Sequence, residues 1–236
     1  MNIIIKLIRY PQRLLIKLNF FNKKNLKERF SIIHESNYWD CSETVSGPGS
    51  TMKNTLNLRR KLKILIKKYK IISIFDAPCG DCHWIKDIFE NSSVKYKGAD
   101  IVDKIIKKNK NKFNYKNTSF YKKDITTQSL PRADLFICRD FMFHLSFKDT
   151  YNFLKNLKKS KSKYLLISSH FKDKNKKNIN KDVISGDFRK IDIFQPPFNF
   201  KKSYEMVIKD YCDGTKKYLY LFKREDFIKF SNSMKF

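Results

Sequence analysis

Several features are scarce in this sequence of 236 residues, and each absence excludes a class of protein. No apolar run is long enough to cross a membrane, because Lys6, Arg9, Arg13 and Lys17 interrupt the apolar N-terminus. No small-residue cleavage site follows that segment, which argues against an export signal. Histidines, cysteines and carboxylates show no spacing typical of zinc ligands, so we expect no metal site.

Cysteine is also scarce. The chain has an odd number of cysteines, widely spaced along the sequence: Cys41, Cys79, Cys82, Cys138 and Cys212. A chain of this length can fold without disulfide bonds. This pattern favours a reducing compartment, and we expect a cytoplasmic protein.

Acidic residues are few beside the basic ones, and the formal net charge is +28. A charge of this size is typical of proteins that bind nucleic acid. The chain is also crowded with lysine, asparagine and isoleucine and has only 6 glycines and three alanines, as expected when coding sequence drifts toward A and T. Part of the charge therefore reflects composition, and a nucleic-acid partner is not the favoured interpretation.

The length predicts one folded domain that follows a short N-terminal extension. Hydrophobic residues make up 41% of the chain and aromatic residues 15%, enough for one substantial core. We predict a basic, amphipathic helical segment over residues 1–35 and the domain over residues 36–236. Residues 1–25 either bind an anionic membrane surface or pack on their own domain, and Pro11 interrupts their helical pattern.

Short apolar runs alternate with helical patterns from residue 52 onward. Strands are predicted over 71–77, 95–102, 118–125, 133–140 and 163–170, with a closing pair over 204–212 and 217–225. Helices are predicted over 52–70, 82–92, 103–113 and 147–160. This order predicts an α/β fold: a Rossmann-like, doubly wound, mostly parallel seven-stranded sheet with helices on both faces and the last strand antiparallel.

The stretch IFDAPCGDCHWIK, residues 74–86, has three interpretations: a redox dithiol, a haem attachment site or a cofactor-binding loop. A haem site would require export to an oxidising compartment. Dithiol folds of this pattern are about half as long and mix antiparallel strands. We favour the cofactor loop, in which Cys79 is a small turn residue and Cys82 faces the core.

Four aspartates mark predicted strand ends. Asp76, Asp100, Asp124 and Asp140 are separated by 24, 24 and 16 residues, which suits one strand-helix unit each. A single acid in this position is usually a helix cap or a turn residue. Four in phase indicate a binding site, because ligands of open α/β sheets bind beyond the carboxyl ends of the strands.

With these motifs in place, residues 36–225 resemble the class I S-adenosylmethionine-dependent methyltransferases. IFDAPCGDCHWI, YKGADIV, FYKKDI and LPRADLFICRDFMFHLS look like the first four motifs of that family. Together with the upstream SGPGST they are similar to a bacterial subgroup, some of whose members are linked to surface-carbohydrate assembly. The first loop departs from the family pattern, because only Gly80 remains where two or three glycines are usual.

The resemblance implies S-adenosyl-L-methionine as the cofactor. Asp76 and Gly80 would lie under its methionine moiety, and Asp100 would accept hydrogen bonds from both ribose hydroxyls. Asp124 would receive the adenine amine. The full set of implied cofactor-binding residues is Gly49, Ser50, Asp76, Pro78, Gly80, Trp84, Asp100, Ile101, Asp124 and Ile125.

The candidate catalytic residues lie in RDFMFHLS. Asp140 and His144 stand four apart, and if a helical turn begins at Phe141 the carboxylate can orient the imidazole as a general base. Arg139 would neutralise the cofactor carboxylate or hold an anionic acceptor. His170 is a second candidate base, and residues 185–198, with Arg189, are a candidate wall for the acceptor.

We therefore predict a methyltransferase that modifies a hydroxyl group of a sugar or another small acceptor in surface-glycan biosynthesis, either in the cytoplasm or peripherally at the inner membrane face. Two alternatives stay open. Eight lysines and no acid between Lys104 and Lys123 suggest RNA methylation. A non-catalytic adaptor that kept the fold is the other alternative.

Overall fold

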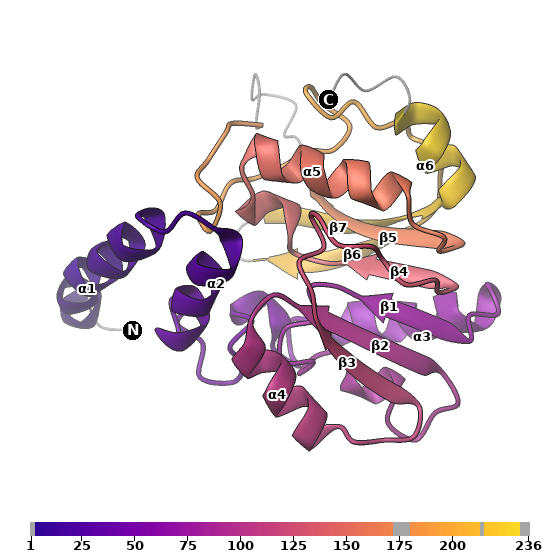
Figure 1. Ribbon diagram of the computed structural model, residues 1–236, viewed down its shortest axis with the longest axis horizontal. Coiled ribbons are helices and arrows are strands. Elements are labelled where there is room, and N and C mark those ends of the chain that lie inside the picture. Colours follow the sequence, from indigo (N-terminus) through magenta and orange to yellow (C-terminus); the bar gives the residue numbers. More distant parts are fainter. Residues whose placement is uncertain (1–2, 172–179, 213–214, 232–236) are drawn as a thin grey trace.

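The computed structural model describes residues 3–171, 180–212 and 215–231. Its strands form a seven-stranded sheet in the order β3-β2-β1-β4-β5-β7-β6 (Figure 1). The strands are β1 Ser73–Asp76, β2 Lys95–Asp100, β3 Thr118–Lys122, β4 Leu135–Cys138, β5 Tyr164–His170, β6 Tyr204–Cys212 and β7 Thr215–Lys223.

The strand directions confirm the predicted α/β fold. From β3 to β5, each neighbouring pair is parallel. Strand β7 is antiparallel to both β5 and β6, so the last strand of the chain is the one that runs against the rest. The strand order reverses between β1 and β4, and in such sheets the crevice beyond the carboxyl ends of these strands is where ligands bind.

Helices cover both faces of the sheet, which explains why its strands are continuous apolar runs rather than alternating ones. On β1, Ile74 packs into the core beside α3 (Leu56–Lys68), whereas the next residue, Phe75, packs into the core beside α5 (Phe147–Lys158) and α6 (Arg224–Ser231). Helix α4 (Asp103–Lys112) lies on the α3 side.

The predicted helix over residues 82–92 is wrong, because the structure has only a short 3-10 turn, η2 (Lys86–Ile88), in that segment. Cys82 has a φ of 54°, a left-handed conformation that an α-helix of L-residues cannot accommodate. The apolar residues that suggested a helix, Trp84, Ile85 and Phe89, are buried all the same. Their spacing reflects packing against the core.

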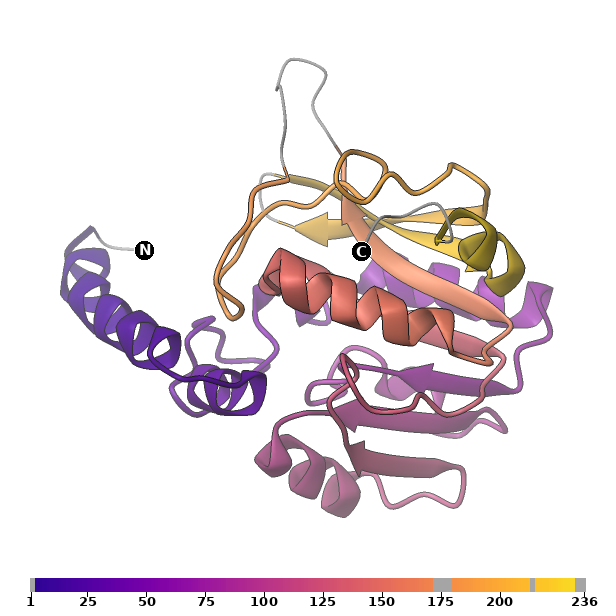
Figure 2. The ribbon, with the colours of Figure 1, turned by 45° about the horizontal axis from the view of Figure 1, so that its top comes forward.

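The N-terminal segment forms two helices, α1 (Ile3–Phe21) and α2 (Leu26–Glu35). They lie beside each other, with α1 standing away from the sheet (Figures 1 and 2). The helix α1 continues through Pro11. The predicted domain boundary after residue 35 falls at the end of α2, and the division into two units stays a prediction. Over the described ranges, no helix combines the length and apolar character that a membrane span requires.

Candidate active site

A cavity of about 250 Å³ opens at the carboxyl ends of β1, β2 and β4. All three predicted catalytic residues and eight of the ten predicted cofactor-binding residues line it: Arg139, Asp140, His144, Gly49, Ser50, Asp76, Pro78, Gly80, Trp84, Asp100 and Ile101. The other two, Asp124 and Ile125, border a neighbouring cavity of about 20 Å³ that shares Pro78, Asp100 and Ile101 with the first.

Asp100, the last residue of β2, is fixed by its neighbours' backbone. Its Oδ2 accepts a hydrogen bond from the Gly80 amide at 3.1 Å, and its Oδ1 accepts one from the Val102 amide at 3.0 Å. Burial raises the pKa of Asp100 to about 6, although these backbone donors work in the opposite direction. Two oxygens offer roughly four lone pairs. The carboxylate can therefore accept further hydrogen bonds from a ligand without moving.

Asp76, the last residue of β1, is also fixed by a hydrogen bond, in this case from a side chain. The Tyr96 hydroxyl donates to its Oδ2 at 2.6 Å. Burial raises the pKa of Asp76 to about 7, whereas the Tyr96 hydrogen bond and the Arg139 charge lower it. The carboxyl group is thus oriented before any ligand arrives, and its protonation changes near neutral pH.

Gly80 is the position of the first loop where an added side chain would be strained. It has a φ of 54°, and a Cβ atom there would lie 2.2 Å from the Ser46 hydroxyl oxygen. The next residue, Asp81, accepts hydrogen bonds from the hydroxyls of Thr44 and Ser46 and from the Val45 amide. The loop around residues 44–50 is therefore tied closely over the strand-end loop.

The two cysteines of the C-x-x-C stretch are free thiols in the core. Cys82 is fully buried, as predicted. Burial raises the pKa of the Cys79 thiol well above its ordinary value. Catalytic and redox thiols need a lowered pKa, because the thiolate is the reactive form. The structure thus agrees with the cofactor-loop interpretation and not with a redox dithiol.

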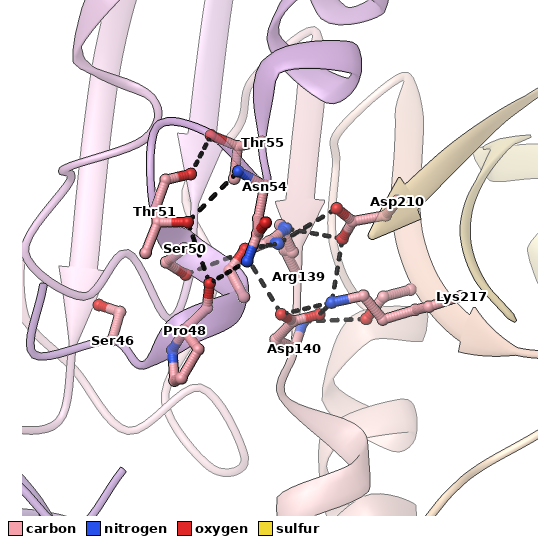
Figure 3. Close-up of polar contacts among 12 residues, drawn as sticks. Ser46, Pro48, Ser50, Thr51, Asn54, Thr55, Arg139, Asp140, Asp210 and Lys217 are labelled. Carbon is pink, nitrogen blue, oxygen red and sulfur yellow. Dashed lines mark hydrogen bonds and ion pairs between the residues drawn. The ribbon is translucent and has the colours of Figure 1, made fainter. Parts of the chain in front are cut away.

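Four charged groups meet at the end of β4 in a buried network (Figure 3). Lys217 Nζ of β7 contacts both oxygens of Asp140 at 2.7 Å and Asp210 Oδ2 of β6 at 3.1 Å. Arg139 donates to Asp210 through Nε at 2.9 Å and Nη2 at 3.2 Å. Lys217 and Asp210 are 1% and 2% exposed, so the ion pair between them lies almost entirely out of water, whereas the side chain of Asp140 is 22% exposed and lines the cavity.

The network fixes the predicted catalytic residues Arg139 and Asp140. Burial alone would raise the pKa of Asp140, but the charges of Arg139 and Lys217 outweigh it and lower the pKa to about 2. Arg139 also donates to the Gly49 carbonyl at 2.7 Å and the Ser50 hydroxyl at 3.0 Å. Arg139 is thus a buried anchor for the loop over the cavity, and its predicted contact with a cofactor carboxylate stays a prediction.

The imidazole of His144 is oriented by a backbone carbonyl, not by Asp140 as we predicted. His144 Nδ1 lies 3.0 Å from the Asp187 carbonyl oxygen. A carbonyl can only accept, so Nδ1 carries the proton and Nε2 is left as the proton acceptor. Burial lowers the pKa of His144, which keeps the ring neutral at pH 7. Asp140 does not take the orienting role, because the Nδ1–H group of His144 is already donated to the Asp187 carbonyl, while the Asp140 carboxylate contacts Lys217 and Arg139.

The second candidate base, His170, does not line the cavity. Its Nδ1 accepts from the Ile191 amide at 3.3 Å, and burial lowers its pKa to about 4. Its ring packs against Phe143 and Phe188. Those two aromatic residues line the cavity, so His170 supports its wall from behind.

Arg189 has a similar supporting position. It is buried, donates to the Thr150 hydroxyl of α5 at 3.1 Å, and lies over the Phe147 ring. Within residues 185–198, the predicted acceptor wall, Phe188 is the residue that lines the cavity.

Sequence reasoning missed several residues of the cavity wall. These are Arg13, Phe30 and His34 of the N-terminal helices. Trp39, which the sequence offered as a residue that could stack on cofactor or sugar, also lines the cavity, and its ring lies 5.3 Å from that of His144. The Nδ1 atom of His34 is buried with no hydrogen-bond partner among the described residues. Among all the residues that the structure describes, no three histidines, cysteines or carboxylates form a cluster that could hold a metal ion.

The search against protein-family models and the search of curated proteins found no match. Solved structures match in fold. Magnesium protoporphyrin IX methyltransferase from Synechocystis PCC 6803, solved with bound SAM, has a TM-score of 0.58 at 13% identity over 85% of this chain and 97% of that one. A SAM-dependent methyltransferase from Leishmania major has a TM-score of 0.58 at 14% identity, over 85% and 87%.

The N-terminal domain of EvdMO1, solved with SAH and D-fucose, has a TM-score of 0.52 at 10% identity, over 71% of this chain and 82% of that one. At such low identity the likeness is one of fold. The chain has the fold of the class I S-adenosylmethionine-dependent methyltransferases.

Proposed function

We propose that the protein binds S-adenosyl-L-methionine and transfers its methyl group to a hydroxyl oxygen of a small acceptor, with a sugar in surface-glycan biosynthesis as the leading candidate. The observation that carries the proposal is the Asp100 carboxylate at the end of β2, which lines the cavity and is fixed by two backbone amides. A rigid carboxylate in this position can accept two ribose hydroxyls at once.

The residues present fit this cofactor. Gly80 lines the cavity, and its positive φ and the nearness of Ser46 favour a residue without a Cβ atom there. Ile101 provides an apolar surface for a base, and the buried Nδ1 of His34 is an unused polar atom in the same wall. When bound, S-adenosylmethionine supplies an electrophilic methyl group on a cationic sulfur.

The acceptor side is aromatic, with one base. Trp39, Phe143 and Phe188 line the cavity beside His144, and their ring faces suit the apolar face of a sugar or another ring. Neutral His144 can take the hydroxyl proton on Nε2 while Asp187 holds the ring. Holding acceptor and methyl group in line accounts for most of the acceleration, and a positioned base adds a factor of about 10² to 10⁴.

Titration calorimetry with S-adenosylmethionine tests the cofactor. The wild-type chain should release heat with one site, and Asp100→Asn should bind about 10- to 100-fold more weakly, because it loses charge-assisted hydrogen bonds worth about 1.5–3 kcal/mol. Asp103→Asn, a partly exposed acid at the start of α4 that does not line the cavity, is the matched control and should bind like the wild type. No heat with the wild type would favour the adaptor.

Mass spectrometry of glycans, nucleotide sugars and RNA from cells with and without the gene tests the acceptor. The proposal expects a glycan or sugar that lacks the mass of one CH2 group when the gene is absent. A change confined to RNA would replace the sugar by RNA as the acceptor.

A further inference from the structure

The helix α1 presents an uncovered apolar face. Leu14, Leu15 and Leu18 are 48%, 67% and 50% exposed. At about 100° per residue they occupy one side of the helix. Three large apolar side chains gathered on one helix face are a feature that soluble surfaces usually avoid unless they bind something.

The opposite side of α1 holds the helix on the protein. Phe20 is fully buried and packs against Tyr38, and a side chain on Gly186 would come within 3.0 Å of its ring. Lys17 pairs with Asp187 at 2.8 Å, and Arg13 donates to the Tyr38 carbonyl at 3.1 Å. The leucine face is therefore directed away from the body of the protein, in keeping with the outlying position of α1 (Figures 1 and 2).

The charge of this part of the chain selects the partner. Residues 1–27 contain seven lysines and arginines and no acid, and the whole chain has a net charge of +28. A second copy on this face would bring two strongly basic helices together. An anionic bilayer has the opposite charge and an apolar layer just below its headgroups.

We propose that α1 docks the protein on an anionic lipid bilayer, with Leu14, Leu15 and Leu18 inserted at the level of the outer acyl chains. Lys23 and Lys24, in the turn after α1, lie next in the chain and reach the headgroups. Arg13, on the opposite side of α1, lines the cavity, so docking would place α1 between the membrane surface and the cavity wall. This inference does not depend on methyl transfer.

Sedimentation of the full chain with lipid vesicles tests the proposal. The wild type should bind vesicles of phosphatidylcholine mixed with phosphatidylglycerol, bind phosphatidylcholine alone far less, and lose affinity as salt rises. Replacing Leu14, Leu15 and Leu18 by serine should weaken binding by about tenfold or more. The matched control is Leu56→Ser with Ile64→Ser, which removes apolar side chains of similar exposure, 44% and 53%, from α3; it should bind like the wild type.

A second measurement keeps the test independent of the triple variant. Leu15→Trp should show a blue-shifted emission, quenched by brominated lipids, when anionic vesicles are added. Unchanged emission, or wild-type binding by the triple serine variant, would overturn the proposal. A dimer in sedimentation velocity that the triple variant abolishes would also overturn it, because a second copy would then cover this face.

Discussion

The buried ammonium group of Lys217 is the strongest test of how this site is held together. We expect Lys217→Met, which keeps most of the length of the side chain and removes its charge, to lower the free energy of unfolding by about 3–5 kcal/mol. The substitution removes a cation that contacts both Asp140, which is partly exposed, and Asp210, which is buried, and it leaves Arg139 in contact with both carboxylates.

The magnitude follows from the geometry. At 2.7 Å and an effective dielectric constant of about 20, one ion pair between Lys217 and Asp140 has a Coulomb energy of about 6 kcal/mol. Lys217 makes a second such contact with Asp210 at 3.1 Å. Burying the charge of the lysine costs free energy, and methionine avoids this cost. This gain offsets part of the lost Coulomb energy and leaves the range given above.

Thermal and urea unfolding, followed by circular dichroism, measure the effect. For a chain of this size the melting temperature should fall by roughly 6–20 °C. Lys216→Met, the exposed neighbour on the same strand, should change it little. In the double variant Lys217→Met with Asp140→Asn, part of the loss should return, because one negative charge leaves with the positive one. A loss below about 1 kcal/mol for Lys217→Met would refute the reasoning.

Three further predictions concern the loop and the chemistry. His144→Asn should lower kcat by about 10²- to 10⁴-fold with little change in S-adenosylmethionine affinity, whereas His83→Asn, outside the cavity, should keep full activity in the same assay. Gly80→Ala should destabilise the protein by at least about 1 kcal/mol in urea unfolding, because φ is positive and Ser46 is too close; Gly49→Ala, whose added Cβ meets nothing nearer than 3.5 Å, should be tolerated. The pKa of Asp100 is raised to about 6, so below that pH the acid form dominates, which lacks the negative charge and carries a proton on one of the two oxygens that would accept the ribose hydroxyls. Affinity for S-adenosylmethionine should therefore rise about tenfold from pH 5 to pH 7 in calorimetry, and a flat profile would contradict this role for Asp100.

The strands and the aspartates at their ends could be predicted from the sequence because both depend on local patterns. Runs such as LFIC are apolar throughout because helices cover both faces of the sheet. Parallel strands also bring their carboxyl ends to one edge, so Asp76 and Asp100 could be placed together before any coordinates were known.

The contacts that complete the site could not be predicted in this way. Lys217 is one lysine among many, and its pairing with Asp140 depends on how the β6-β7 hairpin docks on β5. The group that orients His144 is the carbonyl of Asp187, and a backbone acceptor leaves no trace in the identity of the side chains. For residues 82–92 the local pattern itself misled the prediction. Their apolar residues have the spacing of a helix, but in the structure they are buried residues of a loop with one short 3-10 turn.

The network at the end of β4 also has a consequence for synthesis on the ribosome. Arg139 and Asp140 emerge long before Asp210 and Lys217, the last of which follows Asp140 by 77 residues. Until the final hairpin has been translated and has docked, these two groups lack their buried partners, and the loop that Arg139 anchors has no firm support. The binding site is therefore completed only once the β6-β7 hairpin is in place, so a chain truncated before Lys217 should be defective in the crevice as well as shorter.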